Sequence, residues 1–146
     1  MQFPILVTLI ALITYQTLST LVSVARGKYK VVAPATTGNV NFERVYRAHL
    51  NYLENLVIFL PLVWISGSNL GYFTAESWMT VITNPGYYIF YSTYMVSSIV
   101  WLISKALFSM AYINDWEFKI KLGFNIGATI STLILFILGI VSLFWI

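Results

Sequence analysis

The 146-residue chain contains no cysteine. Disulfide bonds, thiolate metal sites and a cysteine nucleophile are therefore excluded. A thiol that takes part in the chemistry of this protein must be supplied by a substrate. The single histidine, His49, has no partner at the spacing of a metal site, so no metal is expected.

Charged residues are also scarce. They make up 9% of the chain, whereas hydrophobic residues make up 59%. A soluble protein carries about 25% charged residues, which cover its water-facing surface. A bilayer removes that requirement, because lipid solvates apolar side chains. The net charge of +3 is small and dispersed, so nucleic acid is not an expected partner.

Long apolar stretches, by contrast, are abundant. A bilayer core requires about 20 apolar residues per helix, and we expect spans over roughly residues 3–25, 45–66, 87–112 and 122–145. The N-terminal segment lacks the basic residues and cleavage site of a secretory signal, so it is interpreted as a retained first span. Backbone groups in lipid must pair within their own segment. The sequence therefore predicts an all-α membrane protein, with one four-helix domain over residues 1–146.

The charges lie on one side of this predicted bundle. Four spans place the first and third loops on one face, and the second loop with both termini on the other. The first and third loops and their helix ends hold most of the charges: Arg26, Lys28, Lys30, Glu43, Arg44, Arg47, Asp115, Glu117, Lys119 and Lys121. The second loop, residues 66–86, holds only Glu76. By the positive-inside rule the basic face is predicted to be cytoplasmic, in a bacterial inner membrane or the endoplasmic reticulum.

The second predicted span begins with a polar stripe. On a helix, one stripe roughly 100° wide contains Arg44, Arg47, Asn51, Glu54 and Asn55. Ionisable groups at membrane depth cost roughly 2.5–3.5 kcal/mol each, so they usually face a partner or a wet cavity. Two interpretations remain open. The stripe is either a self-satisfied network that ties the bundle together, or a binding site for a small zwitterionic or anionic ligand.

Further candidate residues lie off this stripe. His49 points away from it, toward a subunit interface or a backbone carbonyl. One face of the third span contains Lys105, Phe108, Tyr112 and Asp115, with Lys119 beyond them. Lys105 is close enough to the basic side to extend its ammonium to the interface, and contact with a ligand is the alternative. Tyr112 either anchors the helix at the membrane boundary or forms a hydrogen bond to a ligand.

Residues 42–54, FERVYRAHLNYLE, resemble the most characteristic motif of the MAPEG family (membrane-associated proteins in eicosanoid and glutathione metabolism). Members of the family begin their second helix with F-E-R-x-x-R-A-x-x-N-x-x-E, and seven motif positions agree here. Pro34, Thr36, Thr37 and Gly38 also resemble the loop that precedes the motif. The resemblance implies a homotrimer of four-helix subunits that binds glutathione between neighbouring subunits, toward the cytosolic side.

The resemblance also assigns roles to residues. It implies that Arg47, Asn51 and Glu54 contact glutathione and that Arg26 and His49 contact it from the neighbouring subunit. Arg44 and Tyr112 are further candidates for the same site.

Departures from the family pattern concern the chemistry. The third helix of the family carries Tyr-x-x-x-Tyr and, seven residues later, an Arg that stabilises the thiolate; these positions hold Phe108, Tyr112 and Lys119 here. Phe108 lacks the hydroxyl, and Lys119 keeps the charge without the planar fork of arginine. An arginine found in the first loop of some members is Gly27 in this chain.

Together these features predict a membrane glutathione transferase that also has peroxidase activity. Glutathione is the co-substrate, and a hydrophobic electrophile or lipid hydroperoxide arrives through the membrane, as in detoxification. A cation near the sulfur raises its thiolate fraction; Lys119 is the candidate, with Arg26 in reserve. Three alternatives stay open: a non-enzymatic member that presents a lipid to a partner enzyme, a glutathione-dependent isomerase, and, ranked last, a small channel subunit.

Overall fold

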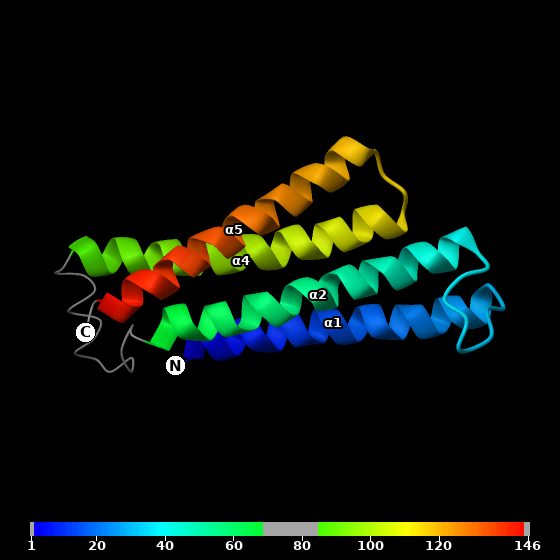
Figure 1. The fold of residues 1–146 in the computed structure, drawn as a ribbon, viewed down its shortest axis with the longest axis horizontal. Coiled ribbons are helices and arrows are strands. Elements are labelled where there is room, and N and C mark those ends of the chain that lie inside the picture. The colour runs from blue at the N-terminus through cyan, green and yellow to red at the C-terminus, as the bar shows by residue number, and fades with distance from the viewer. Residues whose placement is uncertain (1, 69–84, 145–146) are drawn as a thin grey trace.

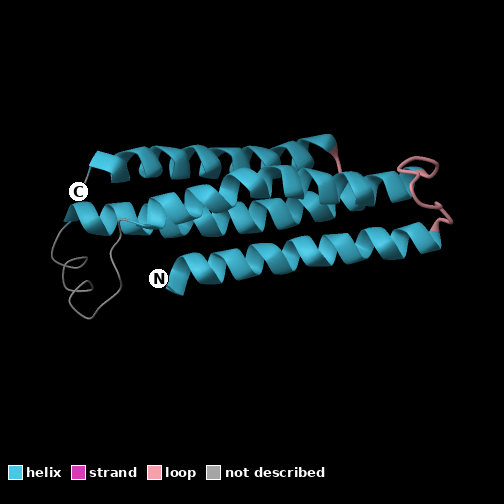
Figure 2. Ribbon diagram, turned by 60° about the horizontal axis from the view of Figure 1, so that its bottom comes forward, coloured by secondary structure: helices cyan, strands magenta, loops and turns pink. Residues whose placement is uncertain are grey.

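The structure is a computed structural model that describes residues 2–68 and 85–144. This part of the chain forms four α-helices: α1 (Gln2–Lys28), α2 (Val40–Ser68), α4 (Pro85–Ile113) and α5 (Phe118–Phe144). They lie lengthwise beside one another (Figures 1 and 2). Each of the four is long and apolar enough to cross a membrane. The all-helical, four-span expectation is therefore confirmed.

Each helix begins before its predicted span, because the spans were counted from apolar residues alone. At the start of α2, the Asn39 side chain accepts hydrogen bonds from the backbone N–H groups of Asn41 and Phe42, at 3.0 and 3.3 Å. This is an N-cap, which satisfies donors that have no partner within the helix. Glu43 Oε1 also accepts a hydrogen bond from the backbone N–H of Gly38 at 2.8 Å. The cap therefore starts α2 at Val40, within the polar segment before the apolar run.

The two described loops lie at the same end of the bundle. The α1–α2 and α4–α5 loops share one end, and the starts of α1 and α4 lie at the other (Figure 1). Among the described residues, the charged side chains gather at the end with these two loops, except Glu54 and Lys105 within the helices. Glu76 belongs to the segment outside the described residues. The one-sided charge pattern expected from the sequence therefore corresponds to one end of the bundle.

Aromatic packing and buried polar contacts hold the helices together. Phe59 of α2 stacks on Trp101 of α4, with ring centroids 3.6 Å apart. The Tyr52 hydroxyl donates a hydrogen bond to the Ala11 carbonyl of α1 at 3.1 Å, and Ser66 donates to the Leu135 carbonyl of α5 at 2.7 Å. Buried hydroxyls need such partners in the absence of water. α2 thus contacts all three other helices and is the central element of the subunit.

The outer face of the bundle is apolar. Large exposed side chains on α1 and α5 include Leu6, Ile13, Phe136 and Leu143. The threonine hydroxyls of α1 donate to backbone carbonyls four residues earlier, as Thr14 does to Ile10 at 2.9 Å. A surface of this kind suits contact with lipid, where polar groups must be satisfied within their own helix.

Gly127 allows α5 to approach α4 closely. A Cβ atom added to Gly127 would lie 2.9 Å from Ser104 Oγ and 3.7 Å from Ser104 Cβ, whereas one added to Gly123 would meet nothing within 4 Å. The two glycines are four residues apart on the same helix, so they form a matched pair.

We therefore predict that Gly127→Leu destabilises the subunit and that Gly123→Leu does not. A leucine at position 127 would force α5 away from Ser104, and overpacking of this kind costs about 1–3 kcal/mol. The midpoint of thermal unfolding in detergent, followed by helical circular dichroism, measures the difference. Equal midpoints for the two variants would contradict the close contact at Gly127.

Candidate functional site

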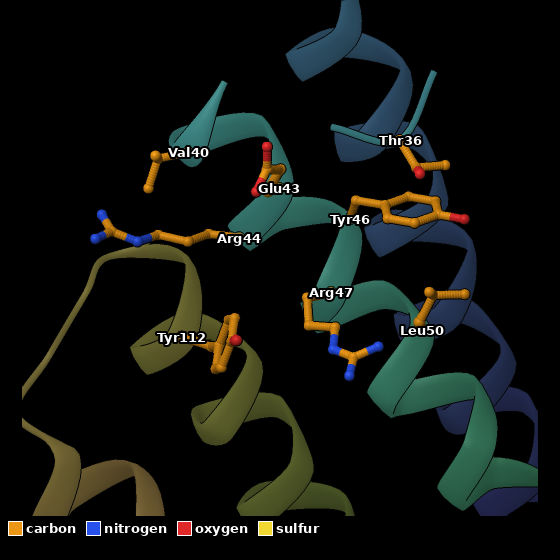
Figure 3. Close-up of a pocket in the computed structure, with 8 residues that line it drawn as sticks. All are labelled: Thr36, Val40, Glu43, Arg44, Tyr46, Arg47, Leu50 and Tyr112. Carbon is orange, nitrogen blue, oxygen red and sulfur yellow. The ribbon is translucent and has the colours of Figure 1, made fainter. Parts of the chain in front are cut away.

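A pocket with a volume of about 470 Å³ lies between the start of α2 and the end of α4. It is lined by Thr36, Val40, Glu43, Arg44, Tyr46, Arg47, Leu50 and Tyr112 (Figure 3). Three of the residues predicted from the sequence, Arg44, Arg47 and Tyr112, are therefore brought together here. They come from two helices that run in opposite directions, so the α2 stripe faces the end of α4.

Arg47 supplies a cation to this pocket. Its side chain is exposed, and it forms no hydrogen bond or ion pair with any other residue that the structure describes. Arg47 lies seven residues after the start of α2, roughly 10 Å along the helix axis. A planar guanidinium of this kind can bind a carboxylate through two parallel hydrogen bonds.

Asp115 joins the other charges at the rim of the pocket. Its carboxylate accepts from Arg44 Nη2 at 2.6 Å and from Lys121 Nζ at 3.3 Å. Its backbone adopts a φ of 54°, a left-handed conformation that ends α4 and that aspartate tolerates. Lys121 Nζ also lies 5.6 Å from the centre of the Tyr112 ring. Asp115 therefore links α2 to the first turn of α5 across the end of α4.

A second polar cluster lies deeper in the bundle, around Lys105. This lysine is 1% exposed, and its Nζ donates to Asn51 Oδ1 at 3.3 Å and to Asn125 Oδ1 at 2.9 Å. The same ammonium lies 5.2 Å from the centre of the Phe108 ring and is attracted by the Glu54 carboxylate. The expectation that Lys105 extends to the interface is wrong, because two carboxamide oxygens hold its charge inside the bundle.

Arg26 stabilises the first loop. Its Nη1 donates to the carbonyl oxygens of Val31 and Ala35 at 3.3 and 2.8 Å, and its guanidinium lies 4.9 Å from the centre of the Phe42 ring. It does not line the pocket. Within the subunit, Arg26 therefore holds the chain segment that leads into α2.

His49 and Glu54 also lie away from the pocket. The His49 ring stacks on Tyr15 of α1, with centroids 5.0 Å apart. Both of its ring nitrogens are covered and have no hydrogen-bond partner among the described residues. Glu54 is exposed on α2, one turn beyond Asn51.

Lys119 and Lys121 occupy positions that differ from the expectation. The fourth span was expected to begin at residue 122, but α5 begins at Phe118, so both lysines belong to its first turn. Lys119 is exposed and has no ion pair within the described ranges, whereas Lys121 contacts Asp115 and Tyr112. Counting seven residues from Tyr112 indicated Lys119. The sequence does not indicate that α5 begins at Phe118, and it is this early start that brings Lys121, and not Lys119, to the Tyr112 ring.

The chain is similar in sequence to known membrane-associated proteins. The MAPEG family model matches residues 4–144. An uncharacterized protein of Synechocystis is 33% identical over 143 residues, which are 98% of this chain and 89% of that protein. Human microsomal glutathione S-transferase 2 is 51% identical over 43 residues, 30% of this chain and 29% of that protein. Bovine leukotriene C4 synthase is 39% identical over 61 residues, 42% of this chain and 41% of that protein. These last two matches thus cover less than half of each protein.

We predict that Arg26→Met loosens the first loop without destroying the bundle. Hydrogen bonds from a charged donor contribute about 1.5–3 kcal/mol, and the variant loses those to Val31 and Ala35. Backbone hydrogen exchange over residues 29–38, measured by mass spectrometry, should become faster than in the wild type. Lys28→Met removes an exposed charge two residues away and serves as the control. Exchange as slow as in the wild type would contradict this role of Arg26.

Proposed function

Because the chain belongs to the MAPEG family, we propose that it is a glutathione transferase that also reduces lipid hydroperoxides. The relatives it resembles include a glutathione S-transferase and leukotriene C4 synthase. The proposed co-substrate is glutathione, and the second substrate is a hydrophobic electrophile or lipid hydroperoxide that reaches the site through the membrane. The proposed orientation puts the two basic loops and the pocket in the cytoplasm.

The observation that supports glutathione binding best is that two charged side chains of α2 lie outside every ion pair in the described part of the subunit, although Glu54 is attracted at a distance by Lys105. Arg47 and Glu54 form no ion pair within the described part of the subunit and lie two helical turns apart, roughly 10 Å. Glutathione carries two carboxylates and one ammonium, so a ligand of its length can meet both charges. Asn51 lies between Arg47 and Glu54 on the same stripe. We propose that these three residues, together with Arg44 and Tyr112 at the pocket, bind the tripeptide.

We also propose that a neighbouring subunit completes this site in a homotrimer. Glu54 is exposed, and the His49 nitrogens have no partner among the residues described in one subunit. An exposed carboxylate on a membrane-spanning helix is costly unless another group meets it, and a neighbour's helix, or the ligand held against it, would do so. The His49 nitrogens are covered within one subunit, so the ring would have to turn away from Tyr15 to reach the ligand. His49 and Arg26 would then contribute from the adjacent protomer.

The proposed chemistry begins with loss of the thiol proton to water. In the transferase reaction, the thiolate sulfur then forms a bond to an electrophilic carbon; either that carbon loses its leaving group with the bonding electron pair, or the π electrons of an activated double bond move to the neighbouring carbon, which takes a proton from water. In the peroxidase reaction, the sulfur attacks the hydroperoxide and the O–O bond breaks; a second glutathione completes reduction to the alcohol, water and glutathione disulfide. A nearby cation lowers the thiol pKa, as it does for cysteine. Lys119 and Lys121 are the candidate cations.

The first test is calorimetric titration of the detergent-purified protein with glutathione. Arg47→Met and Glu54→Gln are each expected to weaken binding by about tenfold or more, because each removes a charged partner of the ligand. Lys28→Met removes a charge outside the pocket and should bind like the wild type.

Absence of binding in the wild type would refute the proposal. Saturable binding of a fatty acid to that same preparation would then favour a lipid-presenting protein. Equal weakening in Lys28→Met would mean that only the net charge of the basic end attracts glutathione.

A second test compares two neighbouring lysines. We expect Lys121→Met to lower turnover more than Lys119→Met, because Lys121 Nζ lies 5.6 Å from the centre of the Tyr112 ring at the pocket. A thiol pKa higher by one unit lowers the thiolate fraction about tenfold near neutral pH. The ultraviolet absorbance of bound thiolate across pH reports this directly. A larger loss in Lys119→Met would assign the role to Lys119, as the family motif predicts.

A further inference from the structure

The Lys105 cluster constrains the orientation of a carboxamide on the α2 stripe. A lysine ammonium has three hydrogen-bond donors and no acceptor. Only the oxygen of an asparagine side chain can therefore face it. Lys105 Nζ has such a contact with Asn51 Oδ1 and another with Asn125 Oδ1. The orientations of the Asn51 and Asn125 carboxamides therefore follow from the fact that the lysine ammonium can only donate.

The Asn51 nitrogen must then point away from Lys105. Its Nδ2 forms no hydrogen bond with any residue in the described ranges, and it is absent from the fully covered unpaired atoms, which are His49 Nδ1, His49 Nε2 and Trp101 Nε1. The Asn51 nitrogen thus reaches the surface of the half-buried stripe, one turn from Arg47. Two N–H donors are presented there.

The ammonium itself is firmly held. Lys105 is 1% exposed, packs over the Phe108 ring and is attracted by the Glu54 carboxylate. It reaches α2 and α5 from α4, so a displacement of the Asn51 oxygen would leave a buried donor unpaired. Buried unpaired donors are costly, and the cost opposes rotation of the Asn51 amide.

We infer that Lys105 is a positioning residue that locks Asn51 as a hydrogen-bond donor toward the ligand, so that Asn51 binds a carboxylate or carbonyl oxygen of that ligand. This inference rests on the proposed function, because glutathione is the ligand considered. It also divides the stripe by chemistry: Arg47 and Asn51 bind ligand oxygens, and Glu54 binds the ligand ammonium.

The sharpest variant is Asn51→Asp. It keeps the oxygen that faces Lys105 but replaces both outward N–H donors with an acceptor. Glutathione affinity should fall about thirtyfold or more, because a donor to a charged group is lost and like charges meet. If the amide faced the other way, its oxygen would contact the ligand ammonium, and Asn51→Asp would keep or strengthen binding.

A double-mutant cycle tests the role of Lys105. Lys105→Met keeps an unbranched apolar chain in the core and should weaken glutathione binding about fivefold by freeing the Asn51 amide. In an Asn51→Ala background the same change should have no further effect. Asn125→Ala removes the other oxygen on Lys105 and is the matched control; it should leave affinity within about twofold.

A spectroscopic measurement needs no ligand. In protein labelled with ¹⁵N-asparagine, the Asn51 side-chain signal is identified by its loss in Asn51→Ala. It should show slow rotation about the Cβ–Cγ bond, the rotation that exchanges the positions of the oxygen and the nitrogen. Lys105→Met should accelerate that rotation. Additive effects in the cycle, or rotation unchanged by Lys105→Met, would overturn the inference while leaving glutathione binding intact. Absence of binding in the wild type would instead remove the proposed function, and the rotation measurement would still decide whether Lys105 locks Asn51.

Discussion

The polar contacts inside the bundle depend on the buried ammonium of Lys105, which donates hydrogen bonds to Asn51 and Asn125. It lies within the membrane-spanning part of α4, about eight residues from the helix end, roughly 12 Å. Lys105 is 1% exposed, so bulk water cannot solvate its charge and the protein must supply the partners. Asn51 from α2 and Asn125 from α5 do so, and the three helices are joined at one point. Removing Lys105 would leave both carboxamide oxygens without this donor, which explains why polar residues appear there in a set.

The charged residues at the end with the two loops differ from Lys105 in their access to water. There the charges can reach water, and Arg44, Asp115 and Lys121 form contacts that are partly exposed. Exposed ion pairs contribute little to stability, about 0–1 kcal/mol. Their effect is geometric: Asp115 draws Lys121 toward Tyr112 and holds Arg44 at the rim of the pocket. Stability therefore comes from the apolar and deeply buried contacts, and the rim sets the electrostatics of the pocket.

The helices could be predicted from the sequence because length and apolarity decide them in lipid. Their ends could not, since the Asn39 cap and the early start at Phe118 depend on local hydrogen bonds. The α2 stripe was also visible, because helical periodicity places Arg47, Asn51 and Glu54 on one face. Helical periodicity does not show which side chain of a neighbouring helix faces each of these residues. Lys105 was expected to extend outward, and Lys121 was not singled out, because both positions depend on how α4 and α5 pack.

The distribution of paired and unpaired charge favours the proposed binding site over a self-satisfied network, the two interpretations that the stripe left open. A self-contained network would pair every charged group, as Lys105 is paired with two carboxamides. Arg47 and Glu54 have no such hydrogen-bonded partner within the described residues of the subunit, although both lie on a membrane-spanning helix. A carboxylate at the depth of Glu54 remains costly until a partner meets it. Under the proposed function, glutathione or a neighbouring protomer would meet these charges, and because it would bind the folded state alone, its binding would also stabilise the bundle.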